Sequence, residues 1–552
     1  MTPRRAAGRV RLAMLAFGAV FAAIGGRLVW LGVEPAVQVK ERIDAEAALA
    51  RTRPRILDRN GKQLATDIET SSIYAEPRRM LDTDEAAEAL IEVMPELDPQ
   101  ELHRRLSKDR GFVWVKREIS PRDQVMVHRL GIPGVGFLTE QRRVYPNGNV
   151  VSHAIGAVDV DNKGIAGIEQ YLDKSGLVSE NGKDVLKPVE LALDLNVQNA
   201  VRDELVKAKA EFQAIAASGV VVDVNTGEIV AFVSLPDYDP NVPTDALKPD
   251  NINRVAVGVY EMGSTFKALT LAMGLDSGLV RLTDRFDATH PLRYGRFSID
   301  DFHPTRRVLS VPEIFVHSSN IGTARIALKI GVDGHKAFLK KLGQLDRLRT
   351  ELAESAHPIV PRNWGELNTV TIAFGHGIAV APLQALMATA ALVNGGKLIP
   401  PTFLKRSKSE AEQVAVQVIK PHTSDQMRYL MRLNATHKEG SAKKADVPGY
   451  RVGGKTGTAE KVINGRYSSE KVMNSFTAVF PSEAPRYALL VMLDEPKPTK
   501  NTYGYRTSGW NAAPTTGKII ARIAPLLGIE PDFNAPPMLP PGYTEASLGE
   551  IR

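Results

Sequence analysis

The apolar run LAMLAFGAVFAAIGGRLVWLGV, residues 12–33, restricts the possible folds of this chain more than any other stretch. Arg27 is its one charged residue, and about 20 consecutive apolar residues are enough for a helix to cross a bilayer. Arg27 lies near the far end, where its long side chain can reach the lipid headgroups. We therefore predict a transmembrane anchor at residues 12–33. The alternative is a cleaved signal peptide with its small residues at 22–26, but the apolar run continues beyond them.

The charges on either side of this run predict its orientation. Four arginines precede it, at positions 4, 5, 9 and 11, whereas the charges of residues 34–44 are mixed in sign. Cytoplasmic flanks of membrane helices carry the excess of Lys and Arg. Residues 1–11 are therefore expected to be a cytoplasmic tail. The rest of a single-pass protein of the inner, cytoplasmic membrane would then be periplasmic or otherwise extracytoplasmic.

The composition of the chain is that of folded globular domains. Of its 552 residues, 43% are hydrophobic and 24% are charged, and this length predicts two or three domains. No cysteine is present, which excludes disulfides, thiolate metal sites and a cysteine nucleophile. The net charge of +7 is compatible with a membrane surface, a wall polymer or nucleic acid as a neighbour, and equally with solvated surface arginines.

Strand, helix and turn patterns divide the outer part of the chain into regions of α+β type. The first region is polar and rich in turns and short strands. The second begins with a helical pattern over residues 196–212 and two apolar strands within 219–236, which predicts an antiparallel sheet flanked by helices. The end of the chain is rich in proline and is expected to be a loose tail. The predicted boundaries of these three segments are 34–190, 191–525 and 526–552.

The stretch VPGYRVGGKTGTAE, residues 447–460, satisfies two motifs with incompatible functions. Residues 449–456 match the phosphate loop of NTPases, whereas residues 455–457 are the K-T-G element of serine acyl-enzymes that react with penicillin. A phosphate loop needs a buried strand before it and a helix after it. Here the preceding KKADVPGY is not an apolar strand, and the Asn464-Gly465 turn follows. An extracytoplasmic site would also find little nucleotide, so we favour the acyl-enzyme element and expect no nucleotide binding.

A nucleophile for such an enzyme is present in VYEMGSTFKALTLAMG. Ser264 and Lys267 are three residues apart at the start of a helical pattern, so their side chains share one face. A serine is a poor nucleophile unless a base takes its proton. A lysine can be that base only if burial or a cationic neighbour lowers its pKa. We therefore expect Lys267 to lie in a partly dry pocket.

The order of the motifs distinguishes Ser264 from chance matches. Ser264 is followed by Ser318-Ser319-Asn320 and then by Lys455-Thr456-Gly457, and three short motifs in this order rarely coincide by chance. The S-x-x-K pattern also occurs at Ser441/Lys444 and Ser468/Lys471, but neither of these matches is followed by both of the other motifs.

The second and third elements supply the remaining catalytic groups. Ser318 can relay a proton between Lys267 and the leaving amine, and Asn320 can hold Lys267 and a substrate amide. Lys455 adds positive charge. A helix cap or a turn is the alternative role for Ser318 and Asn320. His317 is expected to line the pocket rather than to act as a base.

The residues around Lys455 are expected to bind the substrate. Gly457 leaves room for the substrate backbone along an edge strand, and the hydroxyls of Thr456 and Thr458 can bind a carboxylate. The backbone N–H groups of Ser264 and Thr458 would form the oxyanion hole. The scattered histidines suggest no metal site, and we expect no metal and no cofactor.

Together with further stretches, these motifs resemble the class B penicillin-binding proteins. The resemblance extends from the anchor to about residue 525. Pro54, Met262 and Ala478 depart from the usual pattern, but none occupies a catalytic position. The other stretches that carry the resemblance are RPRILDRNGKQLA, RRVYPNGNVVSHAIGAVDVDNKGIAGIEQYLD, LALDLNVQ, GHGIAVAPLQ and VPGYRVGGKTGTA.

The resemblance implies a non-catalytic pedestal of the dimerisation type at residues 34–190 and a transpeptidase domain at residues 191–525. It implies a D,D-transpeptidase that cross-links peptidoglycan stem peptides through an acyl-enzyme on Ser264 and is a target of β-lactams. VPGYRVGGKTGTA is most similar to the septal, cell-division type. A glycan polymerase and division proteins in the membrane would be its partners, and no nucleic acid. The alternatives are a membrane-bound β-lactam sensor or hydrolase, and a division scaffold with little catalysis.

Overall fold

One helix, Leu12–Trp30, begins the part of the chain that the structure describes. It is exposed along its whole length and is long and apolar enough to cross a membrane. This agrees with the predicted anchor, of which residues 31–33 lie outside the described residues, as does the predicted tail at residues 1–11. The computed structural model describes residues 12–30, 51–107, 110–180, 184, 186–295, 297–463 and 465–542.

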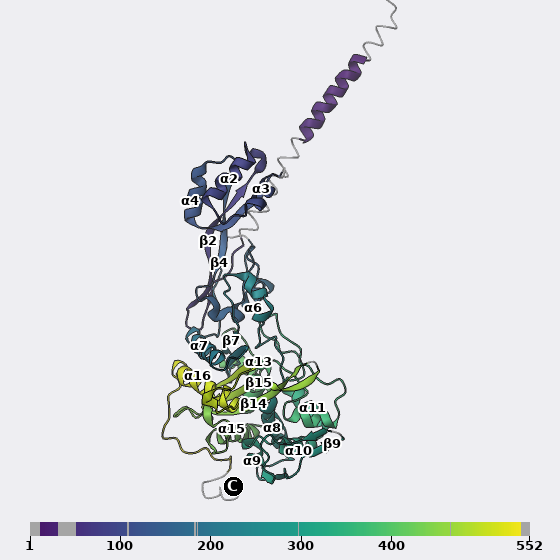
Figure 1. Ribbon diagram of the computed structural model, residues 1–552, viewed down its shortest axis with the longest axis vertical. Coiled ribbons are helices and arrows are strands. Elements are labelled where there is room, and N and C mark those ends of the chain that lie inside the picture. Colours follow the sequence, from purple (N-terminus) through teal and green to yellow (C-terminus); the bar gives the residue numbers. More distant parts are fainter. Residues whose placement is uncertain are drawn as a thin grey trace, which may run out of the picture.

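A mixed α/β region follows the anchor and forms the upper part of the folded molecule in Figure 1. The long strand β2 pairs antiparallel with β1, β3 and β4, and β5 joins β1 in parallel. Three helices share a hydrophobic core with β2, β3 and β4. The strands are β1 (Ile56–Leu57), β2 (Gln63–Ala75), β3 (Val113–Ile119), β4 (Val135–Val144) and β5 (Val189–Glu190), and the helices are α2 (Thr83–Val93), α3 (Pro99–Leu106) and α4 (Pro121–Leu130).

A buried ion cluster lies at the base of this region, where α5 (Ser152–Ile155) and α6 (Gly167–Lys174) pack. Arg53 and Arg143 each donate through Nε to a different oxygen of Glu169, both at 2.7 Å, and none of the three side chains is exposed. Asp173 and Asp67 accept further bonds from the two guanidinium groups. The cluster therefore ties together segments that are far apart in the sequence.

The lower region is built on a five-stranded antiparallel sheet with the order β14-β15-β16-β6-β7. Both faces of the sheet are covered (Figure 1). Val220 and Val222 of β6 belong to the core formed with α13, whereas Val221 belongs to the core formed with α7 and α16. The elements are β6 (Ala216–Asp223), β7 (Ile229–Leu235), β14 (Gly453–Ile463), β15 (Arg466–Phe480), β16 (Tyr487–Asp494), α7 (Leu195–Glu211), α13 (Pro382–Val393) and α16 (Ala512–Leu526).

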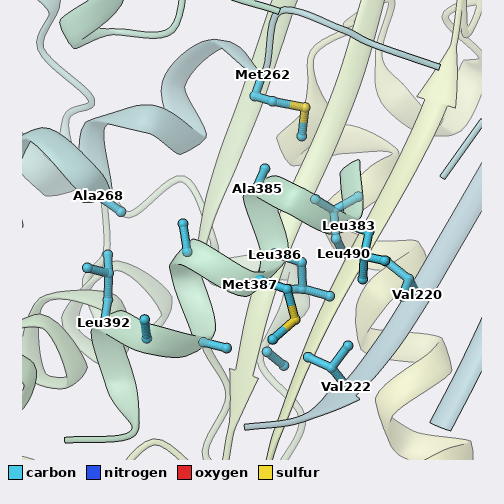
Figure 2. Close-up of a cluster of buried hydrophobic side chains, with 14 of the residues drawn as sticks. Val220, Val222, Met262, Ala268, Leu383, Ala385, Leu386, Met387, Leu392 and Leu490 are labelled. Atoms are coloured by element: carbon cyan, nitrogen blue, oxygen red, sulfur yellow. The ribbon is translucent and has the colours of Figure 1, made fainter. Parts of the chain in front are cut away.

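Helix α13 is the centre of the larger core. All twelve of its residues are buried, so this helix packs against the protein on every side rather than along one stripe. Figure 2 shows Leu383, Leu386 and Met387 of α13 beside Val220, Val222 and Leu490 of the sheet. The other helices of the lower region are α8 (Lys267–Ser277), α9 (Val311–Val316), α10 (Asn320–Ile330), α11 (Val332–Lys341), α12 (Glu366–Ala373), α14 (Lys408–Val414) and α15 (Pro421–Thr436).

Short paired strands complete the lower region. They are β8 (Arg285–Asp287) with β11 (Val308–Ser310), β9 (Leu292–Tyr294) with β10 (Phe297–Ile299), and β12 (Lys397–Leu398) with β13 (Val416–Gln417). The predicted α+β class, with an antiparallel sheet flanked by helices, is confirmed.

The proline-rich segment after α16 is not loose over its described residues. The backbone N–H of Asp532 donates to Gly449 O at 2.9 Å, and the guanidinium of Arg451 donates to Pro536 O at 2.8 Å. Met538 packs against the large core. The expectation of a loose tail is therefore wrong up to residue 542, because Arg451 supplies the backbone carbonyls with partners. Residues 543–552 lie outside the described residues.

A side-chain amide closes one edge of the sheet. Gln198 of α7, which is 1% exposed, donates to Phe232 O at 2.9 Å and accepts from Phe232 N at 2.7 Å. Gln198 thus makes with β7 the two bonds that a neighbouring strand would make. The same amide nitrogen also donates to Val150 O.

Replacing Gln198 with leucine is expected to lower the free energy of unfolding by about 1–3 kcal/mol, because buried backbone groups of Phe232 and Val150 lose their partners. The loss can be measured by pulse proteolysis of the purified chain in urea. Asn199→Leu is the matched control, since the neighbouring amide is exposed and bonds only to Leu195 O. Equal losses in the two variants would contradict the edge-closing role.

Candidate active site

Ser264 and Lys267 lie where a short 3-10 helix, Gly263–Phe266, runs into α8. This agrees with the predicted helix start. Lys267 is 1% exposed, and its Nζ donates to the hydroxyl of Ser318 at 3.0 Å and to the backbone oxygen of Ser318. Within the described part of the chain, the hydroxyl of Ser264 makes no hydrogen bond. The base is therefore held in place by Ser318 and not by the serine that it would serve.

Ser318 connects two buried lysines. Its Oγ accepts from Lys267 Nζ at 3.0 Å and from Lys455 Nζ at 2.9 Å. Ser318 follows α9 in the left-handed region, with a φ of 55°, a conformation that costs free energy for a residue with a side chain. The strain directs the hydroxyl to the point where α8 and β14 meet. The structure thus brings together the S-x-x-K, S-S-N and K-T-G elements as predicted.

Burial controls the charge of both lysines. It lowers the pKa of Lys267 to about 7, against a smaller opposing effect of Asp301. It also lowers the pKa of Lys455 well below its ordinary value, and the nearby Lys267 lowers it further. The two ammonium groups would face each other across one hydroxyl, so the site disfavours holding both protons. A neutral amine is therefore available near neutral pH.

The rate of acylation of Ser264 is expected to fall in acid, because only the neutral amine of Lys267 can accept the proton of Ser264. The neutral fraction rises with pH through the pKa of about 7. Below this pKa the rate constant should approach a loss of about tenfold per pH unit, and it should level off above about pH 8. Stopped-flow measurements with a chromogenic β-lactam check this, and a constant rate from about pH 6 to 8 would contradict it.

Asp301 is a site residue that the sequence patterns did not reveal. This carboxylate, 7% exposed, accepts from Ser319 Oγ at 2.8 Å and from Ile321 N at 3.0 Å, and so anchors the S-S-N turn. Asn320 donates to Asp300 O at 2.8 Å and makes no bond to Lys267 in the described structure. The expected contact between Asn320 and Lys267 is therefore not observed, and its contact with substrate stays a prediction.

The two threonine hydroxyls of the K-T-G-T strand each have a partner. Thr456 Oγ1 donates to Ser441 Oγ at 2.8 Å, and Thr458 Oγ1 accepts from Ser508 N at 3.1 Å. Ser441 was one of the rejected S-x-x-K matches, yet it lies against the site. Its Lys444 does not serve as a base here, since the ammonium sits 3.0 Å from the ring centre of Trp510.

Gly457 is needed for the packing of the protein itself. A Cβ at this position would lie 2.5 Å from Met262 O and 2.4 Å from Ser475 Oγ. Only glycine lets the segment that carries Ser264 lie directly against β14. This differs from the prediction, which assigned the space to the substrate backbone. Gly263, the residue before Ser264, also lies against the backbone of Thr458, because a Cβ at Gly263 would lie 3.3 Å from Thr458 N. The oxyanion hole formed by the N–H groups of Ser264 and Thr458 stays a prediction.

Together these groups can perform acyl transfer through a serine ester. The segment that carries Ser264 packs against the edge strand β14, a buried neutral lysine can take the proton of Ser264, and a second hydroxyl between two lysines can pass a proton on. Among the described residues no cluster of three His, Cys, Asp or Glu side chains could hold a metal ion. Fold and site define a serine acyl-enzyme of the penicillin-recognising class.

Comparisons with known proteins agree with this class. Residues 217–521 match the family model "Penicillin binding protein transpeptidase domain", and residues 49–187 match "Penicillin-binding Protein dimerisation domain". The chain belongs to the penicillin-binding protein transpeptidase family. The recognised family and the pedestal-plus-transpeptidase architecture are thereby confirmed.

Several relatives span most of the chain. It is 41% identical over 486 residues to the probable peptidoglycan D,D-transpeptidase FtsI of Caulobacter vibrioides, covering 87% of this chain and 82% of that protein. It is 30% identical over 544 residues to the peptidoglycan D,D-transpeptidase FtsI of Escherichia coli, covering 92% and 90%. The fold is similar to that of penicillin-binding protein 3 from Mycobacterium tuberculosis, solved with aztreonam, with a TM-score of 0.68, 22% identity and coverage of 88% and 98%.

The family and the N-terminal helix also indicate where in the cell the protein is located. One apolar helix near the N-terminus precedes the folded regions, and the matches to the two FtsI proteins cover 87% and 92% of this chain. Together they indicate a single-pass protein of the inner membrane with a soluble catalytic domain.

Proposed function

We propose that the chain cross-links peptidoglycan stem peptides as a D,D-transpeptidase with Ser264 as the nucleophile. The neutral amine of Lys267 accepts the proton of Ser264 while Oγ bonds to the carbonyl carbon of the penultimate D-alanine. The peptide bond to the last D-alanine breaks. Ser318 gives its proton to the leaving amine and takes the proton that Lys267 received, so that Lys267 is neutral again. The amine of a second stem then attacks the ester, and the proton it loses returns to Ser264 through Lys267. A new amide is formed and the free serine is regenerated.

The observation that carries this proposal is the buried chain from Lys267 through Ser318 to Lys455, with contacts of 3.0 and 2.9 Å. It provides both a base for the nucleophile and a path for the proton to the leaving amine. While Lys267 is neutral, a proton on Lys455 would add positive charge to the site. The backbone N–H groups of Ser264 and Thr458 would stabilise that oxyanion, a contribution of several kcal/mol.

The substrate would lie along β14, the edge strand of the sheet. Thr456 and Thr458 would present their hydroxyls to the terminal carboxylate, and Asn320 would hold a substrate amide. For this, Thr456 must turn its proton away from Ser441, which can donate in its place because a hydroxyl both donates and accepts. Gly457 keeps Ser264 close to this strand.

A β-lactam would acylate the same serine, because the nitrogen released when the lactam C–N bond breaks stays tethered to the acyl group and cannot leave the site. The test is to incubate the full chain in detergent with a fluorescent penicillin and to locate the adduct by mass spectrometry. Labelling of the peptide that contains Ser264, lost in Ser264→Ala and kept in Ser468→Ala, is expected. A folded wild-type chain without label, or a label on another residue, would refute the proposal.

We also propose the orientation of the enzyme in the membrane and its role in the cell. Arginines 4, 5, 9 and 11 support a cytoplasmic N-terminus and a periplasmic catalytic domain. The motif VPGYRVGGKTGTA and the identity to two proteins named FtsI support a septal role in cell division. A separate glycan polymerase and division proteins in the membrane would be its partners. Wild-type septation by a Ser264→Ala chain would instead favour a scaffold, and rapid release of the penicillin label would favour a β-lactam hydrolase.

A further inference from the structure

His317 directly precedes Ser318, and the mechanism above leaves it unused. It ends α9, where its backbone N–H donates to Glu313 O at 2.9 Å. Its side chain is largely enclosed, with 15% exposed. Because Ser318 is held in a left-handed conformation between two lysines, any movement of His317 acts on the hydroxyl that connects them.

One ring nitrogen of His317 faces two groups that require opposite proton states. Nε2 lies 3.2 Å from Arg307 Nη2 and 3.5 Å from Glu439 Oε2. A guanidinium can only donate, so its hydrogen bond needs a lone pair on Nε2. A carboxylate can only accept, so its bond needs a proton on Nε2. Since one nitrogen cannot do both, the protonation state of His317 selects the partner.

The two partners belong to different parts of the site. Arg307 lies just before β11 and donates to Glu313 of α9 at 2.5 Å, so it is bound to the segment that carries Ser318. Glu439 lies in the turn that follows α15. Two residues further on, Ser441 accepts the hydrogen bond of Thr456 on β14 at 2.8 Å. A change of partner therefore transfers the hydrogen bond of His317 from the S-S-N side to the K-T-G side.

We propose that His317 is a proton-controlled positioning residue for Ser318, bound to Arg307 when neutral and to Glu439 when protonated. The protonated state draws Ser318 away from the two lysines and slows acylation in acid. The proposal rests on the proposed function, because it concerns the same reaction at Ser264. The contacts of 2.9 and 3.0 Å at Ser318 leave little room for such a shift without loss of a hydrogen bond.

The groups around the imidazole restrict protonation of His317 to acidic pH. Burial lowers the pKa of His317 below its usual value. Glu439 raises it and Arg307 lowers it, while Glu313 and His437, the other titratable groups that face the ring, raise and lower it respectively. Protonation of His317 thus follows that of Lys267 as the pH falls.

The test is the pH profile of acylation by a chromogenic β-lactam, with the full chain in detergent between about pH 5 and 8. In the wild type, the loss of about tenfold per pH unit due to Lys267 should steepen toward about a hundredfold once His317 is protonated. His317→Gln keeps a donor and an acceptor but does not titrate, so its profile should stay at about tenfold per unit. His290→Gln, an exposed histidine elsewhere, is the matched control and should behave as the wild type.

Two further variants make the test sharper, because they should shift the steep part in opposite directions. Glu439→Gln removes the carboxylate that favours the protonated ring, so the steep part of the pH profile should move to lower pH. Arg307→Gln removes the guanidinium that favours the neutral ring, so the steep part of the pH profile should move to higher pH. Steepening that survives in His317→Gln belongs to Lys455 and overturns the inference, as does a uniform slope in the wild type or a shift of both variants in one direction. Absence of acylation at pH 8 would instead overturn the proposed function and this inference with it.

Discussion

Lys267→Met is expected to lower the rate constant for acylation of Ser264 by about a thousandfold or more, because Ser264 loses the buried amine three residues along the same helix, and the amine of Lys455 bonds to Ser318 from another element. Methionine has a similar length and fills the same apolar pocket, but it carries no charge that must be desolvated. The variant should therefore be at least as stable as the wild type while being almost inactive. The rate of labelling by a fluorescent penicillin and the melting temperature measure the two effects.

The matched control for this variant is Lys471→Met. Lys471 belongs to a rejected S-x-x-K match, is about half exposed and pairs with Glu495 at 3.4 Å. The Lys471→Met variant should be labelled by the fluorescent penicillin at the wild-type rate. If Lys267→Met kept a rate within about tenfold of the wild type, the proton would have to leave Ser264 by another route, and Lys267 would not be the base.

Glu169→Gln is expected to lower the free energy of unfolding of the pedestal by about 3–5 kcal/mol, because two buried guanidinium groups lose their shared counter-charge. The neutral amide keeps only one acceptor oxygen and would turn its NH₂ group toward an arginine. Arg53 and Arg143 would keep Asp173 and Asp67, which neutralise them in part. Pulse proteolysis in urea, with cleavage followed within residues 51–190, measures the loss.

Glu101→Gln provides the control for Glu169→Gln. Glu101 also accepts from two arginines, Arg104 and Arg105, but it lies at the surface of α3. Surface ion pairs contribute little to stability, so this variant should unfold as the wild type does. A loss of the same size in both variants would show that burial of the cluster is not what makes Glu169 important.

Local signals in the sequence predicted the parts of the fold and site that lie within one motif. The apolar runs of β6 and β7, the helical spacing of α7 and each of the three catalytic motifs depend on residues close together in the chain. Ser264 and Lys267 lie at the start of a helix for the same reason. These features follow from periodicity and turn chemistry, which do not need the tertiary structure.

The contacts that hold these parts together could not be predicted in this way. Lys267 bonds to the backbone of Ser318, Asp301 anchors the S-S-N turn, and Gly457 meets Met262 O, all across long distances in the chain. Each arises when two elements pack, and no local pattern marks the partner. The buried Arg53–Glu169 pair is separated by 116 residues in the sequence and is equally hidden. The role assignments of the site residues stay predictions until the acyl-enzyme is mapped.

The two edges of the catalytic sheet differ in whether their backbone groups are paired. Gln198 seals β7, but β14 must remain unpaired along its outer side if a peptide is to bind there. An unpaired strand edge is also a template for another copy of the chain, so a requirement of catalysis becomes an aggregation hazard during synthesis. The same edge should accept extended peptides by strand addition, and short strand mimics without a reactive ring are therefore a natural starting point for inhibitors.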